Sequence, residues 1–137
     1  MKLGILSVPF EDQSLMEVAD WASTNGFSAM EIACWPQSSG DRRRYAGTCH
    51  INVDGLGAAQ GKDIKDGLEA KGIEISGLGF YPNPLHADAA HRDDVIGHLT
   101  KVIKAAGVMG VPVVNTFLGG DRTLNVDENW TRAQEIF

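Results

Sequence analysis

The sequence predicts an α/β fold in which four strands alternate with four helices. Short apolar runs rich in Val, Ile and Leu recur along the chain, and glycine or proline punctuates their ends. Each run is followed by a segment with helical apolar spacing or a helix-capping pattern. Near-continuous apolar strands are typical of parallel strands covered by helices. The strands are expected at residues 3–8, 27–34, 73–80 and 111–117.

Capping patterns mark the first and last helices. Ser14 is followed by Glu17, and Asn125 is followed by Glu128, which are the N-cap and N3 pairs of a capping box. Gly26 provides the stop of the first helix. The positions of the last helix that are expected to share a face are Val126, Trp130, Ala133 and Phe137.

Periodicity and glycines define the two middle helices. Residues 58–71 are expected to be helical, although two internal glycines each cost about 1 kcal/mol relative to alanine. The third helix is expected from about residue 88 to Gly107 or Gly110. Its apolar positions with helical spacing are Val95, Ile96, Leu99, Val102, Ile103 and Ala106.

The spacing of the units predicts half of a (β/α)₈ TIM barrel. The strands start roughly 36 residues apart on average, close to the roughly 31 per unit of an eight-unit barrel of about 250 residues. Four units leave two unpaired edge strands. Residues 1–137 are therefore expected to form the N-terminal half of one barrel domain that ends inside the fourth helix, or to associate with a second half. The alternative is a doubly wound open sheet, but no Gly-x-Gly-x-x-Gly follows the first strand to support a dinucleotide version.

Composition narrows the functional class. The chain has 137 residues, of which 43% are hydrophobic and 22% are charged, as expected for one globular domain. The net charge of -6 argues against nucleic acids and anionic membranes, which bind basic surfaces. Cys34 and Cys49 are too few for a disulfide framework, so thiols in a reducing cytoplasm are expected. The N-terminal residues contain no apolar segment of the length of a signal peptide or membrane span, and we expect a cytoplasmic protein.

Five residues near the predicted strand ends are candidates for substrate binding, because a (β/α)₈ barrel carries its active site at the carboxyl ends of its strands. Glu31 lies on an apolar strand where an unpaired carboxylate is costly, so it is either a substrate or catalytic group, ion-paired, or turned outward. His50 and His86 lie on loops and can bind hydroxyls, transfer protons, ligate a metal, or simply be solvated. Trp35 and Tyr81 can stack on a sugar ring or pack at the rim.

Other patterns carry weaker signals. The three arginines at residues 42–44 suit phosphate or carboxylate groups, or form a solvated loop. The Gly-Gly-Asp-Arg run at residues 119–122 can cradle a phosphate but lacks Walker spacing. His91 and His98 are seven residues apart, which is not the spacing of a two-histidine metal site, and are expected on the surface. No CxxC or GxSxG motif is present.

Three runs resemble a known family. They are residues 30–36 (Met-Glu-Ile-Ala-Cys-Trp-Pro), residues 75–85 (Ile-Ser-Gly-Leu-Gly-Phe-Tyr-Pro-Asn-Pro-Leu) and residues 110–117 (Gly-Val-Pro-Val-Val-Asn-Thr-Phe). They are similar to the N-terminal half of the sugar phosphate isomerase/epimerase family, the xylose isomerase-like TIM barrels. The resemblance implies a (β/α)₈ fold and a divalent metal ion that binds a hydroxy-carbonyl sugar and stabilises an enediolate. It also implies carboxylates that move a proton between adjacent carbons.

The chain departs from this family in one respect. Family members typically place their metal ligands, two glutamates, an aspartate and a histidine, in the C-terminal half, and residues 1–137 contain none of those positions. The resemblance therefore implies only a substrate-lining role, for Glu31, Trp35, His50, Tyr81 and His86. It also implies that this chain alone is inactive, that its ligand is a small sugar or sugar phosphate, and that a C-terminal half or a second copy covers the open edges.

Two alternatives remain at this point. An apurinic-site endonuclease-like barrel shares the fold, but it needs several metal-binding histidines and a basic groove, which the acidic charge disfavours. A naturally complete four-unit chain would instead favour a non-catalytic carbohydrate-binding module.

Overall fold

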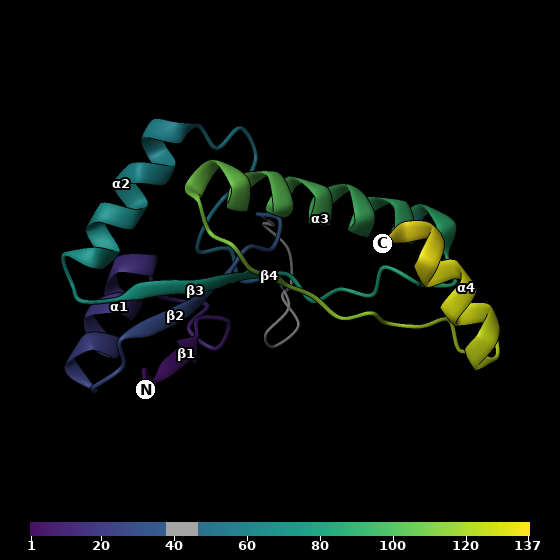
Figure 1. Cartoon of the computed structure of the whole chain (residues 1–137), viewed down its shortest axis with the longest axis horizontal. Coiled ribbons are helices and arrows are strands. Elements are labelled where there is room, and N and C mark those ends of the chain that lie inside the picture. Colours follow the sequence, from purple (N-terminus) through teal and green to yellow (C-terminus); the bar gives the residue numbers. More distant parts are fainter. Residues whose placement is uncertain (38–46) are drawn as a thin grey trace.

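The computed structural model describes residues 1–37 and 47–137. Its elements in chain order are β1 (Gly4–Leu6), α1 (Leu15–Thr24), β2 (Ala29–Ala33), α2 (Ala58–Glu69), β3 (Glu74–Gly79), α3 (Ala89–Met109), β4 (Val114–Asn115) and α4 (Val126–Ile136). All neighbouring strands pair in parallel, in the order β1-β2-β3-β4 (Figure 1). A doubly wound sheet reverses its strand order, so that alternative is wrong and the half barrel is confirmed.

The strands are shorter than predicted. The fourth was expected over residues 111–117, but β4 covers only Val114–Asn115. The amide of Val111 is still bonded to the carbonyl oxygen of Ala106 at the end of α3, and Pro112 has no N–H to donate. The first residues of the apolar run therefore belong to the end of α3, and only the residues at its centre pair with β3.

The helix ends follow the predicted signals. Ser14 and Asn125 cap α1 and α4, and both capping boxes are complete. The side chain of Asp88 accepts a hydrogen bond from the amide of His91 and caps α3. Of the two glycines that were candidates for its stop, Gly110 ends α3, because it adopts the left-handed conformation with φ of 65°.

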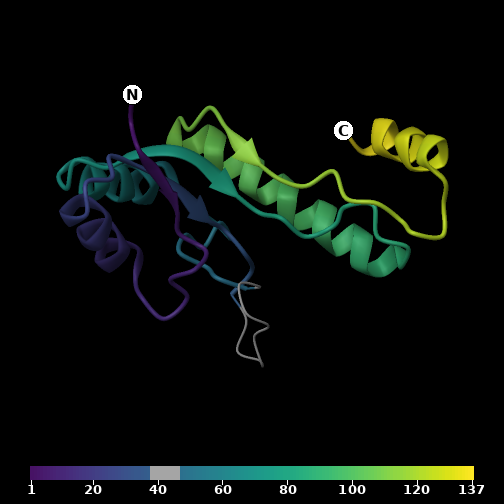
Figure 2. The same cartoon turned by 90° about the horizontal axis from the view of Figure 1, so that it is seen from below.

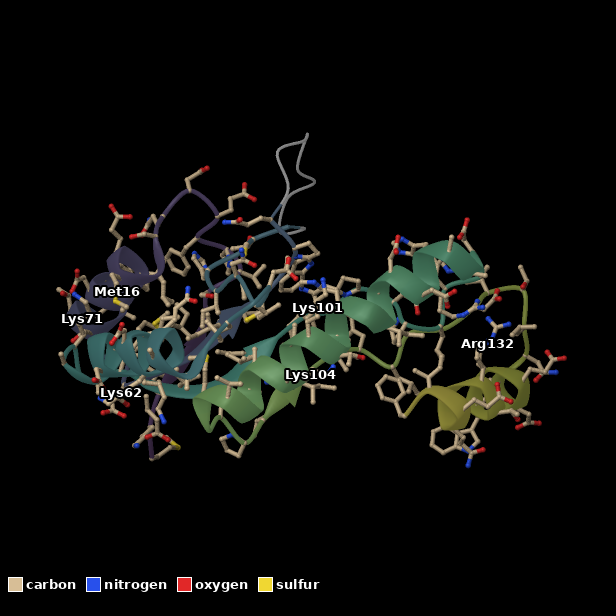
Figure 3. All side chains as sticks on the ribbon, turned by 90° about the horizontal axis from the view of Figure 1, so that it is seen from above. Met16, Lys62, Lys71, Lys101, Lys104 and Arg132 are labelled. Carbon is tan, nitrogen blue, oxygen red and sulfur yellow. The ribbon has the colours of Figure 1, made fainter. Side chains whose placement is uncertain are left out.

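The two glycines inside α2 allow close helix packing. A Cβ atom on Gly61 would lie 3.0 Å from Cγ of Met109 on α3, and one on Gly67 would lie 2.9 Å from Cε of Met16 on α1. Figure 3 shows Met16 at the end of the molecule where α1 and α2 meet. The helix stability that is lost at each glycine is thus offset by the close packing of α2 against α1 and α3.

The apolar core lies between the helices and one face of the sheet. Ile32 pairs with Leu78, and Leu78 pairs with Val114, so these side chains share a face. On α3 the buried stripe is displaced from the predicted one, because Ile103 is 54% exposed whereas His98, Ala105 and Met109 are buried. On α4 only Ala133 is buried, although four residues were expected to share its apolar face.

His98 is a correction to the prediction of a surface histidine. The residue is buried on the inner side of α3, where its Nε2 lies 2.7 Å from the carbonyl oxygen of Cys34. Its ring also packs against Phe80 at a centroid distance of 4.6 Å. The seven-residue spacing between His91 and His98 argues only against a two-histidine metal site. It does not indicate which face of α3 packs against the sheet.

Helix α4 lies apart from α1 and α2. Figures 1 and 2 both show it at the opposite end of the molecule from α1 and α2, beyond the extended segment that follows β4. Within residues 1–37 and 47–137, none of the helices is long and apolar enough to cross a membrane.

Candidate functional site

The face of the sheet opposite the helical core carries a polar cluster at the strand ends. Glu31 on β2 and Asn115 on β4 flank the end of β3, and Tyr81 follows it. The Tyr81 hydroxyl donates to Oε1 of Glu31, and Nδ2 of Asn115 donates to Oε2 over 2.8 Å. Each carboxylate oxygen thus has one donor among the described residues. Glu31 is therefore neither ion-paired with a neighbouring strand nor turned outward, the two alternatives that its sequence context left open.

A glycine makes this cluster possible. Gly79 lies on β3, between the strands that carry Glu31 and Asn115. It pairs with Ala33 on one side and with Asn115 on the other. A Cβ atom there would overlap Oε1 of Glu31 and would lie 3.1 Å from Cε2 of Tyr81. The absence of a side chain therefore lets the carboxylate cross the face of β3 to reach the Tyr81 hydroxyl.

Asn115 and Gly79 were not selected from the sequence. Asn115 falls in a segment that was expected at the barrel mouth, and Gly79 directly precedes another such segment. Their role depends on the register that sets Gly79 against Asn115. For Asn115, one usable signal is its position at the end of a predicted strand, because the active site of a (β/α)₈ barrel lies at the carboxyl ends of the strands.

Aromatic side chains surround the cluster. The ring of Tyr81 lies 4.9 Å from that of Phe117 and 5.8 Å from that of Trp35. Phe117 is 60% exposed, whereas Trp35 is buried, so Phe117 presents the open ring face. Burial, followed by the hydrogen bond and charge of Glu31, raises the pKa of Tyr81. Its hydroxyl consequently remains a protonated donor at neutral pH.

His50 is held within the protein by both ring nitrogens. Its Nε2 lies 3.2 Å from the carbonyl oxygen of Phe10 and 3.1 Å from that of Gln13, so Nε2 carries the proton. Nδ1 then accepts from the Ser7 hydroxyl over 2.9 Å. Burial lowers the pKa of His50 and favours this neutral form.

This serine and histidine pair does not form a nucleophile. The Ser7 side chain is fully buried, and its oxygen also accepts a hydrogen bond from the amide of Ala33 over 2.9 Å. His50 thereby ties the loop after β1 to the segment that precedes α2. Its predicted contact with a substrate remains a prediction, made by a ring whose two nitrogens already have protein partners.

His86 lies at the entrance to α3. Its Nδ1 accepts from the amide of Asp88 over 3.1 Å, and its ring packs edge-on against His91 at 4.6 Å. Its carbonyl oxygen accepts from Arg92 over 2.9 Å. Of the five candidate residues, Glu31, Trp35 and Tyr81 are therefore in one contiguous cluster, while His50 and His86 have separate partners.

Asn83 clamps the loop after β4 to the loop after β3. Its Oδ1 accepts from the amides of Leu85 and Gly120 over 2.9 Å and 3.0 Å, and its Nδ2 donates to the carbonyl oxygen of Gly120 over 2.8 Å. Gly119 is in the left-handed region with φ of 74°. The two loops thus form one wall beside the polar cluster.

The same loop does not fit the interpretation of residues 119–122 as a phosphate cradle. The amide of Gly120 is bonded to Asn83, that of Asp121 to Oδ1 of Asn129, and that of Thr123 to Oδ1 of Asp121. These N–H groups are already used within the protein. Two of them, at Gly120 and Asp121, lie within residues 119–122, and a phosphate there would have to displace their hydrogen bonds.

An ion pair anchors α4 to this wall. Arg132 donates to Oδ2 of the buried Asp121 over 3.0 Å and to the carbonyl oxygen of Leu85 over 3.4 Å. Figure 3 shows Arg132 in the space between α4 and the loop before α3. Hydrogen bonds from the hydroxyl and amide of Thr123, and then the Arg132 guanidinium, lower the pKa of Asp121.

Glu11 is a further carboxylate at the strand ends that sequence reasoning passed over. It lies in the loop after β1, and its Oε2 is buried without a hydrogen-bond partner among the described residues. An unpaired buried oxygen costs free energy. A carboxylate in a polar loop looks ordinary in sequence, so no local signal could have found it.

Comparison with known proteins now identifies the family. Residues 19–137 match the family model described as xylose isomerase-like TIM barrel. The chain belongs to this family. The predicted resemblance to the xylose isomerase-like barrels is thereby confirmed, although a comparison with curated proteins gave no match.

Three solved structures are similar to the chain in fold. D-psicose 3-epimerase from Clostridium cellulolyticum H10, solved with D-tagatose, matches with a TM-score of 0.66 and 19% identity over 99% of this chain and 46% of that chain. The probable 3-DHS dehydratase AsbF from Bacillus anthracis matches with a TM-score of 0.64 and 17% identity over 99% of this chain and 47% of that chain. A sugar phosphate isomerase/epimerase from Parabacteroides distasonis matches with a TM-score of 0.55 and 18% identity over 98% of this chain and 46% of that chain. The chain spans less than half the length of these three structures.

One cavity lies away from the polar cluster. It has a volume of about 460 Å³ and is lined by residues such as Ser28, Ile73 and Val111, which precede β2, β3 and β4. In a (β/α)₈ barrel this amino-terminal face serves stability, while chemistry occurs at the other end. We therefore assign the candidate site to the cluster around Glu31.

The three arginines and a metal site were also considered in the sequence. Residues 42–44, with their three arginines, are outside the described residues. Among the residues that the structure does describe, no three His, Cys, Asp or Glu side chains lie together in a way that could hold a metal ion.

Proposed function

We propose that the chain supplies the N-terminal half of a sugar or sugar phosphate isomerase/epimerase, which moves a proton between adjacent carbons through an enediolate. One observation supports this most directly. The Glu31 carboxylate on β2 is held by donors from the next two units, Tyr81 after β3 and Asn115 on β4, which lie at the carboxyl ends of their parallel strands. The cluster lies where the active site of a (β/α)₈ enzyme is built.

The cluster suits the binding of a polyhydroxylated ligand. Within the described part of the chain each Glu31 oxygen accepts one hydrogen bond, and an ionised carboxylate has further lone pairs that can accept from hydroxyls. The exposed face of Phe117, beside Tyr81, offers apolar surface to the C–H groups of a sugar ring. In this proposal Glu31, Tyr81 and Phe117 bind and orient the substrate.

The proton-transferring carboxylates and the divalent metal ion are expected outside residues 1–137. The described residues do not fit a metal on their own, since no three potential ligands lie together in them. A divalent metal at such a site would polarise the hydroxy-carbonyl group of the sugar. The chain alone is consequently expected to be inactive.

The proposal includes a partner for the open edge of the sheet. Val113 beside β4 is 41% exposed, and Trp130 on α4 is 58% exposed. Such apolar groups along an unpaired strand favour burial. We propose that a second set of four strand–helix units, on the same chain or on a second copy, covers this edge and completes the barrel.

The decisive experiment uses a complete barrel that contains residues 1–137. Ketose substrates such as D-fructose and D-tagatose are incubated in deuterium oxide, and products are followed by NMR. The expected result is isomer or epimer exchange with deuterium at the carbon next to the carbonyl, and loss of exchange after chelation of divalent metal. Activity that survives chelation without deuterium incorporation would overturn the proposal.

A variant connects the activity to this half of the barrel. Tyr81→Phe removes the donor to Glu31 while keeping the ring, so KM is expected to rise more than kcat falls. Thr131→Val, on the exposed face of α4, serves as the matched control because, among the described residues, its hydroxyl bonds only the carbonyl oxygen of Asp127 in its own helix. Cleavage of apurinic-site DNA by the complete barrel would favour the endonuclease alternative instead.

A further inference from the structure

Cys34 and Cys49 face one another across an isolated antiparallel bridge. Cys34 directly follows β2, and the chain returns past it at Cys49. The amide of Trp35 donates to the carbonyl oxygen of Thr48 over 3.2 Å, and the amide of His50 donates to that of Ala33 over 3.0 Å. The hydrogen bonds therefore flank the two cysteines, which form a non-hydrogen-bonded pair.

A non-hydrogen-bonded antiparallel pair is a type of pairing that suits a disulfide. In a non-hydrogen-bonded antiparallel pair the two Cα atoms are about 4.5 Å apart and the side chains project to the same side. Disulfides span Cα separations of roughly 4.4–6.8 Å. The backbone at Cys34 and Cys49 can thus accept a disulfide without a change in strand pairing.

We propose that Cys34 and Cys49 form a reversible disulfide when the protein meets a small disulfide oxidant such as glutathione disulfide. The thiolate of Cys49 attacks one sulfur of the oxidant, which forms a mixed disulfide and releases one glutathione thiolate. The thiolate of Cys34 then attacks Sγ of Cys49 and displaces the second glutathione. The protein loses two electrons and two protons, and the oxidant becomes two thiols.

The order of the two steps follows from burial. Cys34 is fully buried, and its Sγ lies 3.5 Å from the carbonyl oxygen of Ile32. Burial, and then the proximity of Cys49 and of Glu31, raises the pKa of the Cys34 thiol. Cys49 is only half-buried. Cys49 therefore reacts first with the oxidant, and closure by Cys34 is the slow step.

The bond would brace the base of the candidate site. Cys34 lies on the same strand segment as Glu31, and its carbonyl oxygen accepts the hydrogen bond from the buried His98. A disulfide to Cys49 would fix this segment to the returning chain and restrict the unfolded state. The oxidised protein is expected to unfold at a higher temperature than the reduced protein.

The test incubates the folded chain with excess glutathione disulfide, quenches it with acid, and measures intact mass and thiol content. The expected product is a monomer that has lost the mass of two hydrogens and has no titratable thiol. Trypsin can cut between the cysteines at Arg42, Arg43 and Arg44. After denaturation and digestion, the Cys34 and Cys49 peptides should therefore remain joined until a reductant is added.

Single-cysteine variants check the order of reaction. Cys34→Ser should accumulate a stable glutathione adduct on Cys49, and Cys49→Ser should react far more slowly, with circular dichroism showing that both remain folded. The proposal is overturned if the folded wild-type chain keeps both thiols, stops at the mixed disulfide, or forms the bond only in denaturant. The wild-type measurement decides the proposal even if a variant fails to fold.

Discussion

The hydroxyl of Tyr81 donates to the carboxylate of Glu31, which joins the segment after β3 to the middle of the neighbouring strand β2. Fifty residues separate the two in the sequence. The bond crosses the bare backbone of Gly79, and Asn115 completes it from β4. Three units of the half barrel are thus connected through one carboxylate, so changes in this cluster are expected to affect both stability and ligand binding.

Tyr81→Phe should destabilise the chain. The variant removes a hydrogen bond to a charged group, and such bonds contribute about 1.5–3 kcal/mol. Because Tyr81 is only partly buried, the expected loss in the free energy of unfolding is at the lower end, about 1.5 kcal/mol. Urea denaturation measures it, and an unchanged midpoint would show that the bond contributes nothing.

The Tyr81 phenol should ionise above its ordinary pKa. Burial and then Glu31 raise this pKa from 10.0. Because the folded-state value is raised, the associated stability is present below about pH 10 and is lost as the pH rises through the folded-state pKa. The chain has two tyrosines, so the ultraviolet titration of the wild type minus that of Tyr81→Phe isolates this group. A midpoint at or below 10.0 in the difference curve would contradict the prediction.

Gly79→Ala should be more damaging than an alanine elsewhere. Its Cβ atom would overlap Oε1 of Glu31 and push the carboxylate away from Tyr81. We expect a clear drop in melting temperature. Gly97→Ala on α3 is the matched control, since its Cβ atom would meet nothing within 4 Å. That variant should gain up to about 1 kcal/mol of helix stability, and equal effects of the two variants would refute the packing argument.

Two adjacent glycines after β4 should respond differently to alanine. At Gly119 the backbone has φ of 74°, and a Cβ atom would overlap Oδ1 of Asn83. Gly119→Ala should therefore lower the melting temperature and loosen the clamp between the two loops. At Gly120 the nearest atom to a new Cβ lies at an ordinary 3.6 Å, so Gly120→Ala should be tolerated. Thermal unfolding of both variants tests this, and similar melting temperatures would argue against the clamp.

His50 should make stability depend on pH in the weakly acidic range. Its folded-state pKa is lowered from 6.5, chiefly by burial. The unfolded chain therefore takes up the proton first, and the stability is present above about pH 6.5 and is lost as the pH falls through the folded-state value. His50→Gln should flatten this part of the curve in urea denaturation.

The exposed His91 provides the control for this pH dependence. His91→Gln leaves the bonds of His50 to Ser7 and to the two loop carbonyls in place, so it should keep the wild-type slope. If His91→Gln flattens the curve and His50→Gln does not, the prediction is wrong.

Local patterns in the sequence were sufficient for the architecture. The capping boxes at Ser14 and Asn125, and the alternation of apolar runs with helical segments, predicted the four units because caps and periodicity depend on residues close together in the chain. Glu31 was also recognisable, because a carboxylate on an apolar strand requires a partner whatever the fold.

Only the tertiary structure decided which groups meet. Sequence could not assign Tyr81 and Asn115 to Glu31, bury His98, pair His50 with Ser7, or set Cys34 opposite Cys49. Each of these contacts joins residues from different units or loops, and strand register and helix rotation determine them. Those quantities are set by the packing of the whole sheet against its helices, and no local segment of the chain contains them.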